Sequence, residues 1–314
     1  MDLLIGSLIL GTGYAVLETV MLIRKSLDFT SRKWNELLAY NGLKDYKIKD
    51  KKMTNIGYKF KIELPVGGDV LCLENIKENI EKSYECKCII EDIQFSNYVN
   101  LELITNEIEQ QEYKPYLLPN TSVLMGYDFR GDVIVADMLS TPHVLISGLS
   151  GQGKTGLTRT IICNLKDCDK VLINGFKDDF KGININHINT IEDIKSYISG
   201  LLQEIDEGCN RIKPLYIILE ELGKIKDKEL IAAITKLLQY GRHNKIYVIG
   251  IIQIATKEEL KFKSYFNTRV SFRQLDSSSY QVALGVAVDK DLNKREFYVM
   301  SEGLKRGKTF NLEY

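Results

Sequence analysis

The second half of the chain contains short runs of consecutive apolar residues separated by longer amphipathic stretches. Residues 214–219 read Pro-Leu-Tyr-Ile-Ile-Leu, and residues 246–252 contain no charged side chain. Strands buried on both faces, as in a parallel sheet covered by helices, have this continuous apolar character. The further elements expected here are a hairpin at 124–135, strands at 144–146 and 170–174, and helices at 191–207 and 228–240. Strands that alternate with helices predict an α/β fold with a parallel sheet.

A stretch in the first third of the chain has a different pattern, in which apolar and polar residues alternate strictly. Tyr58 to Leu64 alternates with a period of two, which is typical of a strand with one buried face. Three more elements are expected here: strands at 86–91 and 98–103 and a short amphipathic helix at 73–82. Together these elements predict a small α+β module at residues 53–106. Pro115 and Pro119 then mark a linker at 107–121.

The N-terminal stretch is apolar over a length that fits a lipid bilayer. Leu3 to Ile23 contains one charged residue, Glu18, and a helix of this length crosses a hydrocarbon core of ~30 Å. Four basic residues follow closely: Arg24, Lys25, Arg32 and Lys33. This flanking positive charge predicts that the remainder lies in the cytoplasm. We expect a transmembrane anchor at residues 1–25 and a connecting helix at 26–52, and therefore a single-pass protein of the cell membrane. A buried amphipathic helix is the alternative.

Composition adds little about partners. The 314 residues contain 42 Lys and Arg against 42 Asp and Glu, so a nucleic acid would have to bind a local basic patch. The six cysteines form no Cys-x-x-Cys pair, and the histidines lack zinc-finger spacing. The bulk of the chain therefore suits a reduced, cytosolic environment. The α/β domain is expected at residues 122–314.

The apolar strand at 144–146 runs directly into a glycine-rich loop and a helix-compatible segment. Gly148 to Thr155 matches the P-loop pattern Gly-x-x-x-x-Gly-Lys-Thr in its required strand–loop–helix setting. Backbone N–H groups of such a loop point at nucleotide phosphates, Lys154 supplies a positive charge, and the Thr155 hydroxyl is a Mg²⁺ ligand. The expected nucleotide-binding residues are Gly148, Leu149, Ser150, Gly151, Gln152, Gly153, Lys154, Thr155 and Gly156. The sequence therefore predicts that the protein binds ATP with Mg²⁺.

Two carboxylates follow the buried strand at 214–219. In a site that hydrolyses nucleotides, the first, Glu220, would hold Mg²⁺ together with Thr155, and the second, Glu221, would polarise the attacking water. The carboxyl ends of parallel strands meet at one edge of a sheet, where such ligands bind. We therefore expect the two glutamates to lie beside the P-loop.

In their order along the chain, these motifs resemble the FtsK/SpoIIIE family of DNA translocases. The stretches that carry the resemblance are Gly126-x-Asp128-x-x-Gly131, Val135-Ala-Asp137, Pro142-His143 with the P-loop, Lys177, Ile217-Ile-Leu-Glu-Glu221, Gly241-Arg242, Gln253, and Asn267 to Phe272 with Asp276-Ser277. The resemblance covers about residues 122–312 and is greatest to versions carried by Gram-positive conjugative elements. The module at 53–106 is similar to the small domain that precedes the motor in this family. Glu220 is a departure, because the family usually has Asp there.

The resemblance implies a RecA-like P-loop ATPase that works as a homo-oligomeric ring, usually a hexamer, with double-stranded DNA in its pore. Arg242 would act as an arginine finger on a neighbouring subunit, and Gln253 would sense the γ-phosphate. The alternatives are a solvated residue at a helix end for Arg242 and a polar group at a strand end for Gln253. No winged-helix DNA-reading domain follows the matching region, so we expect DNA binding without strong sequence preference.

The expected function is that of a membrane-anchored, ATP-dependent double-stranded DNA translocase in conjugative or plasmid DNA transfer. Relaxase or secretion-channel components are candidate partners. Two alternatives stay open: a viral genome-packaging ATPase with the same chemistry, and a membrane-tethered NTP-binding adaptor that does not translocate.

Overall fold

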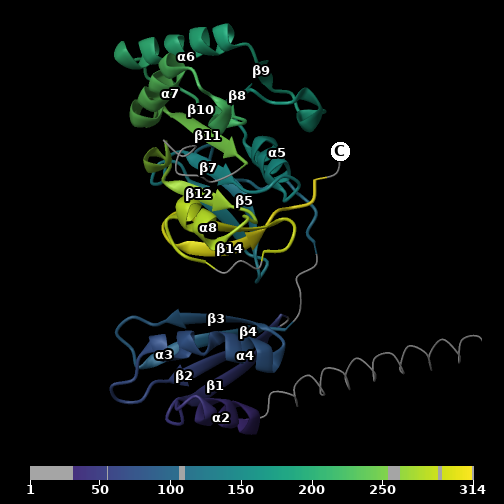
Figure 1. Ribbon diagram of the computed structural model, residues 1–314, viewed down its shortest axis with the longest axis vertical. Helices are drawn as coiled ribbons and strands as arrows, with labels where there is room; N and C mark the ends of the chain where they lie inside the picture. The colour runs from purple at the N-terminus through teal and green to yellow at the C-terminus, as the bar shows by residue number, and fades with distance from the viewer. Residues whose placement is uncertain (1–30, 55, 106–109, 254–261, 289–291, 313–314) are drawn as a thin grey trace, which may run out of the picture. The chain divides into compact units, whose positions relative to one another are not determined.

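The chain forms two compact units, Met1–Glu107 and Ile108–Tyr314 (Figure 1). The computed structural model describes residues 31–54, 56–105, 110–253, 262–288 and 292–312. The expected membrane anchor at residues 1–25 lies outside the described residues. Within the described ranges, no helix combines the length and the apolar character needed to cross a bilayer.

The first unit is built on a four-stranded antiparallel sheet of order β1-β2-β4-β3. Its elements are α2 (Ser31–Tyr40), β1 (Lys47–Thr54), β2 (Gly57–Glu63), α3 (Val70–Asn75), α4 (Lys77–Tyr84), β3 (Lys87–Asp92) and β4 (Tyr98–Ile104). One face of the sheet packs against the helices, where Phe60, Ile62 and Leu101 are buried together with Trp34 and Leu38 of α2. The three strands predicted in this region are confirmed.

Two expectations for the first unit are wrong. The connecting helix predicted at 26–52 is, over its described part, the short helix α2, and residues 47–54 form the edge strand β1. The pattern hid this strand because five of its eight residues are charged, a composition that suits a sheet edge in contact with water. The single helix predicted at 73–82 is two helices, α3 and α4, which meet at Ile76.

The second unit is an α/β fold around a ten-stranded sheet of order β6-β5-β14-β13-β12-β7-β11-β10-β8-β9. Its strands are β5 (Ser122–Asp128), β6 (Val133–Asp137), β7 (Val144–Ser147), β8 (Asp169–Ile173), β9 (Asn186–Ile188), β10 (Leu215–Leu219), β11 (Ile246–Ile252), β12 (Thr268–Ser271), β13 (Glu296–Met300) and β14 (Leu304–Lys308). Its helices are α5 (Lys154–Asn164), α6 (Ile191–Asp206), α7 (Lys228–Tyr240) and α8 (Ser277–Leu284), with 3₁₀ helices η1 (Lys177–Phe180), η2 (Leu222–Lys224), η3 (Gly241–Asn244) and η4 (Lys263–Tyr265). The predicted hairpin at 124–135 is confirmed as β5 and β6.

The sheet is mixed, which corrects the expectation of a parallel sheet. Neighbouring strands run parallel from β12 to β9, whereas those from β12 to β6 are antiparallel. The antiparallel half consists of the hairpins β5–β6 and β13–β14, joined where β14 pairs with β5. Local periodicity identifies strands but does not say which distant strand they pair with, so this half was not apparent from the sequence.

Helices cover both faces of the parallel half. Ile217 and Leu219 of β10 belong to the core that also contains residues of α6, α7 and α8, whereas Tyr216 and Ile218 belong to the core formed with α5. Successive side chains of a strand point to opposite faces, so a strand between two helical layers is apolar throughout. The faces are therefore closed, and the strand ends are where a ligand can bind.

The segment expected as a linker at 107–121 packs against the second unit over its described part. The Tyr113 N–H donates to the Asn311 carbonyl oxygen at 2.7 Å, and the Tyr116 N–H donates to Asn164 Oδ1 at 2.7 Å. The Tyr116 ring centroid lies 5.6 Å from that of Phe310. Residues 110–121 therefore belong to the P-loop unit, although they form neither helix nor regular strand.

Candidate active site

The P-loop joins β7 to α5 in a backbone conformation that requires glycine. Gly148 and Gly153 have φ angles of 142° and 121°. A Cβ atom on Gly148 would lie 2.6 Å from the Cβ of Phe272, and one on Gly153 would lie 3.1 Å from the ring of the same residue. The loop is thus packed against the residue that follows β12. Because α5 begins at Lys154, the unpaired N–H groups of its first turn lie in the loop, where they can bind an anion.

The Lys154 side chain folds over the loop. Its Nζ donates to the carbonyl oxygens of Gly148 at 2.6 Å and Leu149 at 2.9 Å. Burial lowers the pKa of Lys154, and the nearby Glu220 and Glu221 act against this shift by favouring the charged ammonium. The site therefore holds a partly desolvated cation whose hydrogen-bonding partners are neutral carbonyls, which phosphate oxygens can replace.

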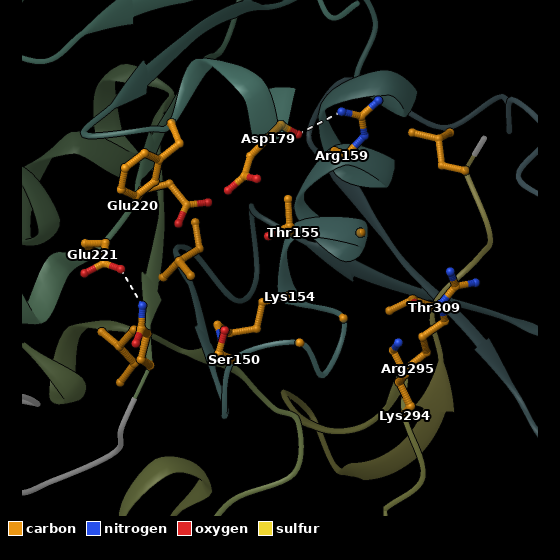
Figure 2. Close-up of a pocket in the computed structure, with 18 of the residues that line it drawn as sticks. Ser150, Lys154, Thr155, Arg159, Asp179, Glu220, Glu221, Lys294, Arg295 and Thr309 are labelled. Carbon is orange, nitrogen blue, oxygen red and sulfur yellow. Dashed lines mark hydrogen bonds between the residues drawn. The ribbon is translucent and has the colours of Figure 1, made fainter. Parts of the chain in front are cut away.

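A cavity of about 420 Å³ lies over the P-loop (Figure 2). The predicted residues that line it are Ser150, Gly151, Gly153, Lys154, Thr155, Gly156, Glu220, Glu221 and Gln253. Gly148, Leu149 and Gln152 are not in this lining: the first two carbonyls accept from Lys154, and the Gln152 carbonyl accepts from the Arg295 N–H at 2.8 Å. The structure therefore brings nine predicted residues from three segments to the lining of one cavity.

The position of this cavity follows from the order of the parallel strands. The P-loop follows β7, Gln253 follows β11, and Glu220 follows β10, and these three strands are neighbours in the sheet. In a parallel sheet their carboxyl ends lie along one edge. Three polar segments far apart in sequence therefore meet at one place.

Glu220 and Glu221 occupy different environments although they are adjacent. Burial and the negative charge of Asp179 together raise the pKa of Glu220 to about 7, while Lys154 opposes the shift. Glu221 has a φ of 56°, in the left-handed region that is unfavourable for a residue with a side chain. Its carboxylate oxygen Oε1 accepts a hydrogen bond from Gln253 Nε2. The turn thus directs the two carboxylates to separate parts of the cavity (Figure 2).

Arg242 is separated from these groups. It lies in η3, directly before β11, and is therefore at the amino ends of the parallel strands. Its side chain is exposed, and it does not line the cavity of its own chain. A role for Arg242 in catalysis therefore requires the cavity of another subunit.

Several residues that line the cavity were not predicted: Arg159, Phe176, Asp179, Lys294, Arg295, Thr309 and Phe310. Arg159 had a local signal, because it lies one helical turn after Thr155 and residues four apart share a helix face. Asp179 follows β8, the neighbour of β10, so the sheet order explains its location. Lys294, Arg295 and Thr309 come from the antiparallel half, and nothing in the local sequence indicates that they reach the P-loop.

The oxygen donors of the cavity fit Mg²⁺ bound together with a nucleotide. Among the described residues, no group of three or more His, Cys, Asp or Glu side chains could hold a metal ion by itself. Thr155, Asp179 and Glu220 do supply a hydroxyl and two carboxylates on one side of the cavity. Mg²⁺ prefers oxygen ligands and usually takes part of its shell from substrate phosphates and water, so this donor set is suited to it.

Comparison with known proteins agrees with this geometry. The model of the FtsK/SpoIIIE family matches residues 109–198. The DNA translocase FtsK of Vibrio vulnificus (strain CMCP6) is 23% identical over 170 residues, covering 49% of this chain and 16% of that protein. The DNA translocase FtsK of Vibrio parahaemolyticus serotype O3:K6 is 22% identical over 209 residues, covering 60% and 19%. The chain thus spans less than a fifth of the length of these curated relatives.

Two solved structures are similar in fold. The pCW3 conjugation coupling protein TcpA, in its monomer form with ATPgS, has a TM-score of 0.58 at 16% identity, covering 89% of this chain and 94% of that one. The cytoplasmic domain of the type VII secretion ATPase EccC of Thermomonospora curvata has a TM-score of 0.54 at 18% identity, covering 63% and 29%. These identities support a common fold only. The family match, the P-loop geometry and the motif order together make the second unit similar to the P-loop ATPases of the FtsK/SpoIIIE family.

Proposed function

We propose that this protein hydrolyses ATP to translocate double-stranded DNA, and that residues 1–25 anchor it in the cell membrane with the P-loop unit in the cytoplasm. The observation that carries the proposal is the meeting of Lys154, Thr155, Glu220 and Glu221 around one cavity of about 420 Å³. A nucleotide-binding adaptor needs the P-loop, but it does not need a carboxylate positioned to activate water.

The roles of the residues follow from their positions. The P-loop N–H groups and Lys154 bind the phosphates. Thr155 and Glu220 would hold Mg²⁺, which would supply positive charge beside the phosphate oxygens. Glu221 accepts a proton from the attacking water. Gln253 donates a hydrogen bond to the Glu221 carboxylate and transfers this hydrogen bond to the γ-phosphate when a nucleotide binds. Arg242, exposed at the amino ends of the strands, acts on the cavity of the next subunit in a ring, for which a hexamer is the usual form.

DNA transfer in conjugation is the setting that we favour. Support comes from the likeness in fold to the pCW3 conjugation coupling protein, which covers 94% of that chain and 89% of this one. Because the P-loop unit is only Ile108–Tyr314, the likeness also includes part of the first unit. A relaxase or secretion-channel component would then be a partner. Genes for a relaxase beside this gene would support transfer, whereas genes for a capsid would favour genome packaging.

DNA-stimulated hydrolysis tests the proposal. With full-length protein in detergent, long double-stranded DNA should raise the rate of phosphate release with little dependence on its sequence. The stimulation should fall steeply between about 50 and about 200 mM salt, because phosphate contacts release counterions. Glu221→Gln protein is the control for contaminating ATPases. ATP turnover that DNA leaves unchanged would contradict translocation and favour the adaptor.

Cell fractionation tests the anchor. Full-length protein should sediment with membranes and need detergent for release. Protein lacking residues 1–25 should appear in the soluble fraction with its ATP binding intact, since the P-loop lies in a separate compact unit. Full-length protein that purifies without detergent would refute the anchor.

A further inference from the structure

A carboxylate outside the P-loop and the Glu220–Glu221 pair faces the same cavity. Asp179 lies in η1, the 3₁₀ helix that follows β8, and lines the cavity together with Thr155 and Glu220. Figure 2 shows its carboxylate turned toward that of Glu220, on the side where the Thr155 side chain also lies. Because β8 and β10 are paired in register, with Ile173 opposite Leu219, the loops that follow them emerge side by side.

Arg159 holds the backbone of this loop. Its Nη1 donates to the Asp179 carbonyl oxygen at 2.8 Å, and Nη1 and Nη2 lie 3.4 Å from the Lys181 carbonyl oxygen. The Arg159 residue is only 5% exposed, and a guanidinium with a buried head binds two carbonyls in a fixed geometry. Arg159 is one turn after Thr155 in α5. The same helix therefore fixes both the Thr155 hydroxyl and the position of Asp179.

Two carboxylates that face each other across a cavity repel unless a cation lies between them. Lys154 does not fill this role with a direct bond, since its Nζ donates to the carbonyls of Gly148 and Leu149. A hydroxyl and two carboxylates suit Mg²⁺, which takes its remaining ligands from phosphate oxygens and water. Asp179 thus lies where a divalent cation would remove the repulsion.

We propose that Asp179, positioned by Arg159, binds the Mg²⁺ ion that accompanies the nucleotide, either directly or through one of the ion's water molecules. The inference rests on the proposed ATPase function and adds a residue to the same site. It also accounts for a glutamate at position 220: with a second carboxylate in the shell, the cation does not depend on one side chain alone.

The Mg²⁺ dependence of nucleotide binding tests this without relying on turnover. The affinity of full-length protein for ATPγS would be measured by calorimetry with excess Mg²⁺ and again with EDTA. The quantity compared between variants is the Kd in EDTA divided by the Kd with Mg²⁺. Asp179→Asn should reduce this ratio about 10-fold, the scale found for groups that orient or support metal ligands. Part of the change should be tighter binding in EDTA, because one negative charge near the phosphates is gone.

Matched variants separate metal binding from folding. Asp178→Asn changes the neighbouring, exposed aspartate of η1, which does not line the cavity, and should keep the wild-type ratio. Asp179→Glu retains a carboxylate and should recover most of it. Arg159→Lys keeps the charge but loses the forked geometry and should lower the ratio less than Asp179→Asn does.

One result would overturn the inference: an Asp179→Asn ratio equal to that of the wild type. If the affinity has then fallen equally with and without Mg²⁺, Asp179 supports the fold of the loop only. Wild-type protein that binds no ATPγS in either condition would instead refute the proposed function itself.

Discussion

The two ends of the parallel strands differ in what lies beside them: a polar cavity at the carboxyl ends and a buried histidine at the amino ends. At the carboxyl edge, the segments after β7, β8, β10 and β11 place charged and polar side chains around a cavity. At the amino edge, His143 precedes β7 and is 1% exposed, and its Nδ1 accepts the Val248 N–H at 3.0 Å. One edge is open to a ligand, whereas the other holds β7 and β11 together.

Burial lowers the pKa of a basic group at each edge, but the charges near the two groups have opposite signs. At the carboxyl edge, burial lowers the pKa of Lys154, but Glu220 and Glu221 favour its charged form. At the amino edge, burial, helped by the nearby positive charge of Arg242 and opposed by the Leu238 backbone, lowers the pKa of His143 to about 4. The charged form of Lys154 is therefore favoured by the carboxylates around it, whereas nothing comparable among the described residues favours a charged His143.

Loss of Lys154 should have the largest effect. Lys154→Ala removes the cation that binds the phosphates, and charge-assisted hydrogen bonds of this kind are worth ~1.5–3 kcal/mol each. Hydrolysis should become undetectable and ATPγS affinity should fall, as measured by phosphate release and calorimetry. Lys166→Ala, an exposed lysine just after α5, is the control and should behave as wild type. Normal turnover by Lys154→Ala would show that the carboxyl edge is not the catalytic one.

Arg242 tests whether catalysis depends on the carboxyl edge alone, because as an arginine finger it would act from the amino edge of one subunit on the cavity of the next. Arg242→Ala should bind ATP normally and hydrolyse it ~10³–10⁵ times more slowly, the usual contribution of an arginine finger. Mixing Arg242→Ala with Glu221→Gln subunits should restore part of the activity, because some interfaces pair an intact arginine with an intact base. If mixed subunits recover nothing, Arg242 is an ordinary residue at a helix end.

Replacing Glu221, the proposed base, tests whether the carboxyl edge activates the attacking water. Glu221→Gln should keep ATP bound and slow its hydrolysis about 10²–10⁴-fold, since an amide cannot accept the proton of the attacking water. Single-turnover kinetics with bound ATP measure this step directly, with Glu302→Gln on an exposed turn as the control. Hydrolysis at the wild-type rate would mean that another group activates the water.

The smallest effect is expected at the amino edge, on stability. His143 has a folded pKa of about 4 and an unfolded value of ~6.5, so between these values the unfolded chain binds a proton that the folded chain does not. Stability should therefore fall as the pH drops below about 6.5, by about 1.4 kcal/mol per pH unit at most.

A substitution isolates this contribution. His143→Asn does not titrate, keeps an acceptor oxygen, and tolerates the φ of 63°. In urea unfolding at pH 7.5 and 5.5, its loss of unfolding free energy on acidification should be smaller than that of the wild type by about 1–2 kcal/mol. Equal losses would show that His143 is not responsible for the acid sensitivity.

The sequence predicted the local parts of the site well. The P-loop, the strands β7, β8, β10 and β11, and the helices α6 and α7 each have a periodicity or a residue spacing that lies within one segment. The grouping of Lys154, Thr155, Glu220 and Gln253 could be predicted as well, because carboxyl ends of parallel strands share an edge. β1 was missed because its many charged residues conceal its alternation.

What the sequence by itself determined is therefore the chemistry that depends on short-range order: a glycine-rich loop before a helix, and carboxylates after a buried strand. Only the tertiary structure decided which distant segments complete the cavity. Lys294 and Arg295 reach the P-loop because β13 and β14 extend the sheet beside β12, and Asp179 faces Glu220 because Arg159 binds its loop. Strand pairing and buried side-chain contacts of this kind join residues far apart in sequence, and no local pattern records them.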